Sequence, residues 1–588
     1  TFTGNKAATK GGAVYNTFYN GDKNAGYVTI ADSTFTNNTA GQAGGAVYND
    51  PNADKSGNYA KLMITDSVFS NNTAQTGGAV YNGANATLSL NGSNVFSGNK
   101  DADGLNDIYN AGTLNIAGNL TLDGGIDGTG NINFASDAVL TATLDTTTLD
   151  TTVIRAKDVV TNGAALNLIL DGAVAEKTYE FITADWVDQA FKIQENNLYN
   201  ITMTDDHQSI VVGKKNTDDI AASVGASTAQ TSVIAGIMAG TSGNESFDTL
   251  ASQIHTALQS TDDAVVRAAV KAAGALAPTE APVSQAMTTA AVTQVLGAVA
   301  TRFSGSVAPA GEASGDISLE DGAVWAKGLF NRSKLGGESG FRSYSRGLAL
   351  GVETYATPDV KVGVGYAYTN ADIKPNDRKS ESDSHSAMLY GEYKPADWYV
   401  NAVVAYTWGR YDDRRYVLDS VVSAKHDVDA LSLQAMTGYD MNALTTKDGR
   451  TLTVTPEVGL RYVNVHEKSY HDSLGNKTGR NRSDTVTGVA GVKTTFDWKV
   501  SETTTLKPEA KVALTYDVKR DNAGSVMTLA NGSVVSVEGD ALKRFGTELS
   551  LGVSAQVDES LELGLTWEGK FRRDYTDNTG MVTLKYHF

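Results

Sequence analysis

The amino-acid sequence predicts an all-β protein with a right-handed parallel β-helix, an α-helical linker and a 12-stranded antiparallel transmembrane β-barrel. Three observations predict this architecture. A short motif recurs at a fixed interval in the first third, the middle is Ala-rich with helical spacing, and apolar and polar residues alternate through the C-terminal half. We expect the β-helix and its cap at 1–215, the linker at 216–311 and the barrel at 312–588.

The motif GGAVYN marks the β-helix. It occurs at Gly11–Asn16, Gly44–Asn49 and Gly77–Asn82, each copy 33 positions after the previous one, and a degenerate copy ends at Asn110. Self-similarity at a fixed period is the signature of a solenoid, in which each unit buries its apolar side against the next. Because the fragments between the Gly and Asn residues are short and strand-like, they favour a parallel β-helix over a helical repeat.

A second motif, Phe-x-x-Asn, precedes each copy. We expect the Phe rings to stack inside the coil. Each Asn is expected to take the left-handed conformation at a corner and to hydrogen-bond the matching Asn one coil away. A ligand-binding role is the weaker interpretation, because stacking already requires both residue types. The predicted stacking residues are Phe2, Phe35, Phe69, Phe96, Asn5, Asn38, Asn72 and Asn99.

The coil is expected to continue over Thr113–Thr161, where Gly, Thr, Leu and Asn recur. The segment Lys177–Gly213 is richer in aromatic residues and predicts antiparallel strands. Such strands cap the end of the coil, because an open sheet edge invites association with other chains.

The region Asn216–Phe303 has few aromatic residues and predicts helices at Phe247–Leu258 and Asp263–Leu276. The sequence ALAPTEAP interrupts the helical pattern, which restarts as a pore helix at 283–303. Twenty-one residues at ~1.5 Å make ~30 Å, enough to cross the barrel, and the small side chains suit a narrow tube. A lipid-spanning helix at Ala281–Thr301 is the weaker alternative, since this uncharged run contains Gln and Thr.

The twelve strands of the barrel are expected from Asp321 onward. Short connections such as TPD and KPAD alternate with long polar loops, as in outer-membrane barrels, and charged residues occupy one face of many strands, which indicates a wet lumen with lipid outside. The expected strands are 322–331, 343–356, 359–370, 384–394, 397–410, 428–440, 451–465, 485–499, 504–518, 543–557, 560–572 and 580–588.

Aromatic residues mark the expected membrane boundaries and the last strand. Trp398 and Trp408 are ten residues apart, about 25 Å along the membrane normal at ~3.3 Å per residue and a tilt of about 40°. The last strand alternates and ends on an aromatic residue, and we expect it to pair with the first strand. The predicted interface aromatics are Trp398, Trp408, Trp498 and Trp567, and the apolar set of the last strand is Val582, Leu584, Tyr586 and Phe588.

This layout resembles a monomeric autotransporter of the type V secretion system, and the repeats resemble those of polymorphic outer-membrane proteins. The resemblance implies a Gram-negative outer-membrane barrel that exports its own passenger and keeps it on the cell surface. It also implies periplasmic chaperones and the barrel-assembly machinery as partners, with Val582, Leu584, Tyr586 and Phe588 as the assembly signal, and outer-membrane lipid around the barrel. In this interpretation the natural chain extends upstream of Thr1.

Composition excludes several functions. The 588-residue chain has no Cys and a formal charge of -19, so thiolate metal sites and a Cys nucleophile are excluded, and nucleic acid is an unsuitable partner. His207 is the only His before 216, and no Gly-x-Ser-x-Gly or His-Glu-x-x-His motif occurs. We therefore predict no catalytic residue, metal or cofactor site, and a β-helix that adheres to an unidentified surface ligand.

Two alternatives remain. The segment is the stem and translocator of a secreted enzyme whose catalytic part lies upstream, or the barrel is a porin-like channel. A further expectation concerns release. Because no Asn occurs between Asn244 and Asn331, the pore helix lacks the nucleophile with which some autotransporters cut themselves, and passenger and barrel are expected to stay joined.

Overall fold

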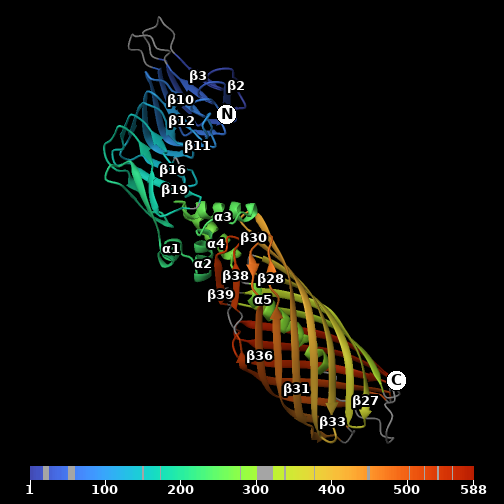
Figure 1. The fold of residues 1–588 in the computed structure, drawn as a ribbon. Coiled ribbons are helices and arrows are strands. Elements are labelled where there is room, and N and C mark those ends of the chain that lie inside the picture. The colour runs from blue at the N-terminus through green and yellow to red at the C-terminus, as the bar shows by residue number, and fades with distance from the viewer. Residues whose placement is uncertain are drawn as a thin grey trace. The chain divides into compact units, whose positions relative to one another are not determined.

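The computed structural model describes residues 1–17, 26–50, 60–148, 151–172, 174–278, 280–300, 322–336, 340–375, 378–446, 450–501, 503–521, 524–538, 542–558 and 560–588. The chain divides into two compact units, Thr1–Ala273 and Gly274–Phe588 (Figure 1). The expected boundary between linker and barrel, at 311–312, lies outside the described residues.

The first unit is built on parallel strands, which confirms the β-helix. One sheet has the order β1-β5-β9-β11-β13-β15-β18-β22 with β4, β8, β16, β19 and β23 alongside, a second has β21-β17-β14-β12-β10-β7-β3, and β2 pairs with β6. The strands are β1 (Phe2–Thr3), β2 (Lys6–Ala7), β3 (Val14–Asn16), β4 (Tyr27–Ala31), β5 (Thr34–Thr36), β6 (Thr39–Ala40), β7 (Val47–Asn49), β8 (Ala60–Thr65), β9 (Val68–Ser70), β10 (Val80–Asn82), β11 (Ala86–Ser97), β12 (Ile108–Asn110), β13 (Thr113–Leu122), β14 (Ile126–Asp127), β15 (Asn131–Phe134), β16 (Val139–Asp145), β17 (Ile154–Arg155), β18 (Asp158–Val160), β19 (Ala165–Asp171), β20 (Lys177–Glu180), β21 (Ile182–Thr183), β22 (Trp186–Val187), β23 (Lys192–Ile193), β24 (Tyr199–Met203) and β25 (Ser209–Lys214).

The end of the coil differs in detail from the expectation. Strands β20, β25 and β24 form the antiparallel sheet expected over 177–213. Within the same segment, however, β21, β22 and β23 still pair in parallel with the coil, so the coil continues to Ile193. Phe191 explains the continuation, because it packs edge-on against Phe134 and Phe181 and extends the apolar core past Thr161.

Five helices follow among the described residues: α1 (Thr217–Val224), α2 (Thr228–Ile237), α3 (Glu245–Leu258), α4 (Asp263–Leu276) and α5 (Glu280–Ala300). Side-chain oxygens of Asn216, Ser227 and Asn244 cap the first three N-termini. After α3, the amide of Gln259 accepts from the N–H of Leu170 at 2.9 Å and donates to its carbonyl at 2.8 Å. Gln259 thus satisfies the edge of β19 as a neighbouring strand does.

The described helices were compared with the length and hydropathy that a membrane span needs. No single described helix is both long enough and apolar enough. One bent pair of helices, Thr217–Val224 with Thr228–Ile237, meets the two criteria together, by length and composition only.

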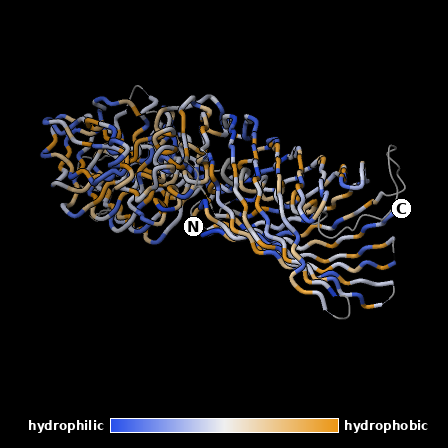
Figure 2. The backbone as a smooth tube through the Cα atoms, turned by 90° about the horizontal axis from the view of Figure 1, so that it is seen from below, coloured by the Kyte–Doolittle hydropathy of each residue, from blue (hydrophilic) through white to orange (hydrophobic). Residues whose placement is uncertain are grey.

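The second unit is a closed antiparallel barrel of twelve long strands, as expected (Figure 1). The first strand pairs with the last, and β31 pairs with β33. Hydrophobic and hydrophilic stretches alternate along these strands (Figure 2). The barrel strands are β26 (Ala323–Leu335), β27 (Phe341–Thr357), β28 (Val360–Pro375), β29 (Arg378–Tyr393), β30 (Trp398–Val417), β31 (Ser420–Tyr439), β33 (Thr451–Glu467), β36 (Asn481–Lys499), β37 (Thr504–Arg520), β40 (Phe545–Val557), β41 (Leu561–Arg572) and β42 (Tyr575–His587).

Short strands complete the barrel. β32 (Met441–Thr445) pairs with β33 near a short turn. Two long loops contribute a separate four-stranded sheet that the sequence did not predict. Its strands are β34 (Tyr470–His471), β35 (Lys477–Thr478), β38 (Gly524–Thr528) and β39 (Val534–Glu538).

Candidate functional site

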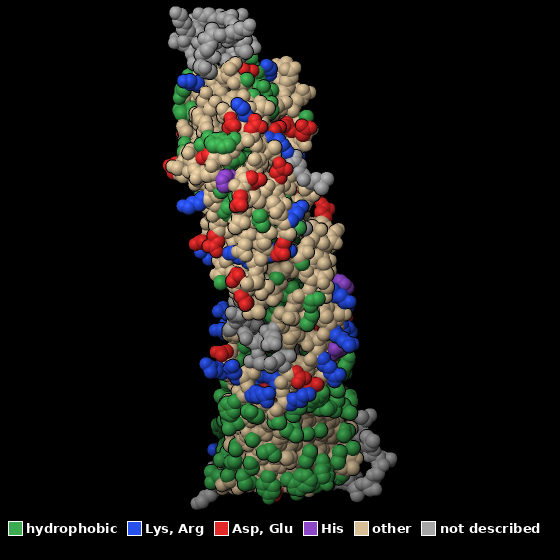
Figure 3. All heavy atoms as spheres, turned by 60° about the vertical axis from the view of Figure 1, so that its left-hand side comes forward, with side chains coloured by type: hydrophobic (Ala, Val, Ile, Leu, Met, Phe, Trp, Pro, Cys, Tyr) green, Lys and Arg blue, Asp and Glu red, His purple; other side chains and the backbone are tan. Residues whose placement is uncertain are grey.

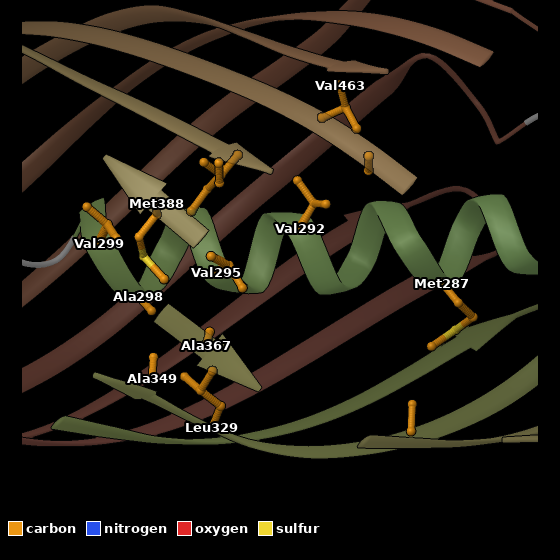
Figure 4. Packing of buried hydrophobic residues seen from close by; sticks show 14 of the residues in the cluster. Met287, Val292, Val295, Ala298, Val299, Leu329, Ala349, Ala367, Met388 and Val463 are labelled. Atoms are coloured by element: carbon orange, nitrogen blue, oxygen red, sulfur yellow. The ribbon is translucent and has the colours of Figure 1, made fainter. Parts of the chain in front are cut away.

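Helix α5 lies inside the barrel and packs one side against an apolar part of the wall. Val292, Leu296 and Val299 are completely buried, and their cluster includes Leu329 on β26 and Met388 on β29 (Figure 4). Other wall residues of the cluster are small, among them Ala349, Ala367, Ala405 and Ala430. Small side chains here leave the width that a helix needs, because a barrel of this size otherwise fills its interior with side chains.

The opposite side of α5 faces charged wall residues. Thr293 and Gly297 line a cavity of about 80 Å³, whose charged wall residues come from β33, β37, β40 and β41. A Cβ on Gly297 would lie 2.6 Å from Oε2 of Glu568, so the approach of this carboxylate requires glycine. The charged lining residues are Glu457, Arg461, Lys511, Glu548, Glu568 and Lys570. The lumen is therefore apolar where the helix packs and charged where it does not.

Hydrogen bonds from the wall hold α5 along its length. The buried ammonium of Lys327 donates to the carbonyl of Ala298 at 2.6 Å, in the last turn of the helix, where a cation is favourable. Nearer the other end, Thr288 and Tyr411 share a 2.8 Å hydrogen bond and Ser284 donates to Glu467 at 3.2 Å.

These contacts fix the direction of the chain. Tyr411 and Glu467 lie towards the barrel end that carries the long loops, whereas Lys327 is near the start of β26, at the end with short turns. The helix enters at the loop end and leaves at the short-turn end. A guanidinium holds the preceding helix at the loop end, because Arg415 donates to Leu276, the last residue of α4, and pairs with Asp472 at 2.6 Å.

A second, larger cavity opens at the short-turn end. It measures about 430 Å³ and is lined by Lys and acidic residues from many strands, including Lys361, Glu392 and Lys507. Glu457 stands between the two cavities, since it pairs with Lys511 at 2.6 Å and with Lys493, which lines the larger cavity, at 3.5 Å. Both cavities thus have charged walls, which suit an aqueous lumen rather than contact with lipid.

The outer face carries the complementary residues. A band of hydrophobic side chains covers the barrel on the face drawn in Figure 3, and Lys and Arg gather along the edge of the band. Trp398, Trp408 and Trp498 lie on the outer face with 40–41% of each residue exposed, and Trp567 is half-buried. Trp398 and Trp498 are at the short-turn end of their strands, whereas Trp408 lies ten residues into β30.

The last strand turns its apolar residues outward. Val582, Leu584, Tyr586 and Phe588 are each about half exposed. Beyond the last pair of the strand, the N–H of Phe588 donates to the carbonyl of Gly322 at 3.0 Å, so the final residue is tied to the first strand.

In the β-helix the predicted Phe and Asn residues form two ladders. The rings of Phe2, Phe35, Phe69 and Phe96 stack in parallel at 4.6, 4.7 and 4.7 Å. The amides of Asn5, Asn38 and Asn72 each donate to the next Asn, and Asn99 donates to Asp107 at 2.8 Å. Burial of Asp107 raises the pKa of its carboxyl to about 7.

One backbone expectation was wrong by one residue. The left-handed conformation belongs to the residue before each ladder Asn, namely Gly4, Asn37, Asn71 and Gly98. The reason is that the ladder Asn must point its amide inward, whereas the preceding residue makes the corner.

The repeat also contains two ladders that the sequence reasoning missed. Tyr15, Tyr48, Tyr81 and Tyr109 stack at 5.1, 5.0 and 5.1 Å, and the Asn residues that follow them hydrogen-bond in series at 2.7–2.8 Å. The signal was the VYN of each GGAVYN copy, since residues at one position of every repeat meet in a solenoid. Among the described residues, no group of three or more His, Asp or Glu is placed to hold a metal ion.

Comparison with known proteins agrees with this geometry. Residues 324–568 match the family model of the autotransporter beta-domain. The C-terminal part of the chain is an autotransporter β-domain. This autotransporter barrel is an outer-membrane barrel, with polar loops at one end and short turns at the other. Segments 1–17, 32–50 and 66–83 match the repeat of the Chlamydia polymorphic membrane protein.

The chain is also similar to outer membrane proteins of Rickettsia. Outer membrane protein B of Rickettsia japonica is 23% identical over 305 residues, which are 48% of this chain and 18% of that protein. Outer membrane protein A of Rickettsia conorii is 24% identical over 270 residues, 42% of this chain and 13% of that protein. The chain therefore spans less than a fifth of the length of these curated relatives.

Two solved structures are similar in part. The translocator domain of the autotransporter NalP from Neisseria meningitidis has 15% identity and a TM-score of 0.42, covering 53% of this chain and 100% of that one. The transport unit of the autotransporter AIDA-I from Escherichia coli has 14% identity and a TM-score of 0.37, covering 47% of this chain and 93% of that one.

Proposed function

We propose that this autotransporter exports its own β-helix through the barrel and displays it at the cell surface, where the β-helix mediates adhesion. One observation carries the proposal: α5 fills the lumen and runs from the loop end to the short-turn end. The C-terminal end of α5 lies at the short-turn end, where β26 begins. The N-terminal end of α5 therefore lies at the loop end, and the segment before α5 leaves the lumen there. A chain held in the pore in this direction fits the completed export of everything before the helix.

The adhesive role rests on what the β-helix offers. The Phe, Tyr and Asn residues that recur in each repeat serve stacking. The remaining surface is polar and acidic. Residues 1–216 contain 12 Lys and Arg against 22 Asp and Glu, a difference of -10. An acidic surface argues against heparin or an anionic lipid as the ligand and favours a neutral or basic surface partner.

The export proposal is tested on intact cells. Protease added outside should remove the β-helix and leave the barrel with α5 protected, and the same protease should also reach the short turns only after the outer membrane is opened. A β-helix that resists digestion in intact cells but is cut in opened cells lies on the inner side and contradicts export.

Adhesion is tested separately. Cells carrying the full chain should bind epithelial monolayers better than cells carrying residues 274–588 at the same surface level. Equal binding would contradict adhesion while leaving the export proposal intact.

A further inference from the structure

A patch of unpaired cations covers the outer face of β26, β27 and β28, where the apolar band ends. The continuous run of apolar outward residues on these strands ends at Phe330, Leu348 and Tyr368, at 58%, 48% and 38% exposure. Beyond them the outward positions are mostly charged, with Tyr344 and Asn370 as the uncharged ones. The exposed cations are Arg332, Lys334, Arg342, Arg346 and Lys374, and Asp372 is the one outward acid among the described residues of these three strand ends.

The register places like charges side by side. Lys334 is directly opposite Arg342, and Arg342 is directly opposite Lys374, so three cations form a row across three strands. Like charges directly opposite each other destabilise a sheet. Within the described part of the chain, none of the five cations of the patch forms an ion pair, and Arg332 instead lies over the ring of Tyr344 at 5.4 Å.

Strands further around the barrel show a different arrangement. On β30 and β31, Arg410 pairs with Asp427 at 3.3 Å, and Arg414 and Lys425 both pair with Asp412, at 3.6 and 3.4 Å. The chain as a whole carries a formal charge of -19, so acids were available to neutralise the patch. At the loop ends of β26–β28, Asp372 is the one outward acid against five cations, so the patch leaves room for a compensating anion from outside the protein.

We propose that this patch binds the phosphorylated headgroup of a lipid in the outer leaflet. The patch lies at the loop end of the barrel and directly borders the apolar band, so one amphipathic molecule can place phosphate on the cations and acyl chains on Phe330 and Leu348. Arginine suits this role, because its planar guanidinium binds phosphate with two parallel hydrogen bonds. Basic clusters at a membrane surface attract anionic headgroups in the same way.

The experiment measures lipid retained by the folded full chain, by native mass spectrometry from detergent micelles. The probes are diphosphoryl lipid A and the same lipid without its phosphates. The test variant combines Lys334→Ser, Arg342→Ser and Lys374→Ser. The matched control combines Arg410→Ser, Arg414→Ser and Lys425→Ser, which removes the same charge from cations that already have acidic partners. Heat-modifiable migration on gels verifies that each barrel is folded.

We expect the wild type and the matched control to retain diphosphoryl lipid A, and the test variant to bind it at least about tenfold more weakly, since each basic residue near an anionic surface contributes a several-fold factor. Loss of the lipid phosphates should weaken binding to the wild type in the same way. Equal binding by the test variant, or equal loss in the matched control, overturns the proposal. Displacement of the lipid by an equal concentration of inorganic phosphate identifies a small-anion site instead and overturns the lipid assignment.

Discussion

Phe35 and Phe69 each lie between two parallel rings and are completely buried, whereas Val68, next to Phe69, is 39% exposed. We expect Phe69→Ala to lower the free energy of unfolding of the β-helix by roughly 3–5 kcal/mol, the usual effect of emptying a buried aromatic site. Val68→Ala is the control, because it shortens an outward side chain of the same strand, and it should have a clearly smaller effect. Limited proteolysis of the displayed β-helix in increasing urea measures both, and equal effects would show that the interior stack is not what stabilises the coil.

Buried His255 makes the first unit sensitive to acid. Its Nε2 lies 2.6 Å from the Tyr199 hydroxyl, and burial lowers its pKa to about 4. The unfolded state has an ordinary His pKa of about 6.5 and therefore binds the proton more tightly, so stability present above about pH 6.5 is lost as the pH falls towards 4. Between pH 7.5 and 5 this group should lower the free energy of unfolding by about 2 kcal/mol.

The variant His255→Gln isolates this contribution. It can keep a hydrogen bond to Tyr199 but does not titrate, so its stability should change less over the same pH interval. The comparison with the wild type is needed because Asp107, whose pKa is raised to about 7, acts in the opposite direction and stabilises the fold at low pH. The same pH dependence in both proteins would exclude His255 as the cause.

Individual contacts differ in how far the sequence predicts them. The Phe and Asn ladders follow from the repeat alone, because a 33-residue period brings the same position of each copy together. The partners of α5 do not. Lys327 and Tyr411 are two of many inward polar residues of the barrel, and no pattern in the chain tells which of them meet a helix that is distant in sequence.

Strands and helices were predicted well where lipid or a repeat imposes a pattern. All twelve barrel strands and their closure agree with the sequence, and α4 has the predicted bounds. The differences lie at the loop ends, where β29 begins at Arg378 rather than 384 and β31 at Ser420 rather than 428. These ends extend beyond the apolar band, so both faces are polar and the alternation that predicts a membrane strand is absent there.

The hydrogen bond that holds α5 in the lumen can be tested through the permeability of the barrel. Lys327→Met removes the hydrogen bond to Ala298, and a buried carbonyl left unpaired costs about 1–3 kcal/mol. We expect low conductance for the full chain in planar bilayers, and more frequent or longer openings for Lys327→Met. Lys570→Met is the control, because it removes a lumen charge from β41 and, among the described residues, Lys570 forms no hydrogen bond to α5. If both variants open equally, pore charge and not the seating of α5 controls the conductance.

The final strand gives a second prediction. Phe588 is tied to Gly322 by its backbone while its ring is half exposed, so its side chain adds little to the barrel's own packing. We expect Phe588→Ser to lower the amount of barrel in the outer membrane and to leave degraded periplasmic chain, through loss of recognition by the assembly machinery. Leu565→Ser on β41 removes a comparable outward apolar residue and is the control. Normal levels of heat-modifiable Phe588→Ser barrel would contradict the assigned role.

The two units place opposite requirements on one chain. The β-helix buries its apolar residues inside a coil, whereas the barrel turns them outward and fills its interior with charges, so composition averaged over the chain hides both. The two patterns can still be told apart in the sequence, because the repeat, the small-residue helix and the alternating strands occupy separate, consecutive stretches of the chain.

The continuity of the chain is the last prediction. Self-cleavage by attack of an Asn side chain on its own backbone needs an Asn in or just after the pore helix, and none occurs between Asn244 and Asn331. Asp316 and Asp321 lie outside the described residues, and an Asp is the poorer substitute because ionisation removes its role as an electrophilic partner. We therefore expect a denaturing gel of outer membranes to give a single band of about 61.9 kDa for the 588 residues, with any upstream residues added to that mass. A sample from intact cells treated with protease shows, on the same gel, the pattern expected when the β-helix and the barrel are separated. Two stable fragments without added protease, cut within 281–321, would show that another cleavage chemistry releases the β-helix.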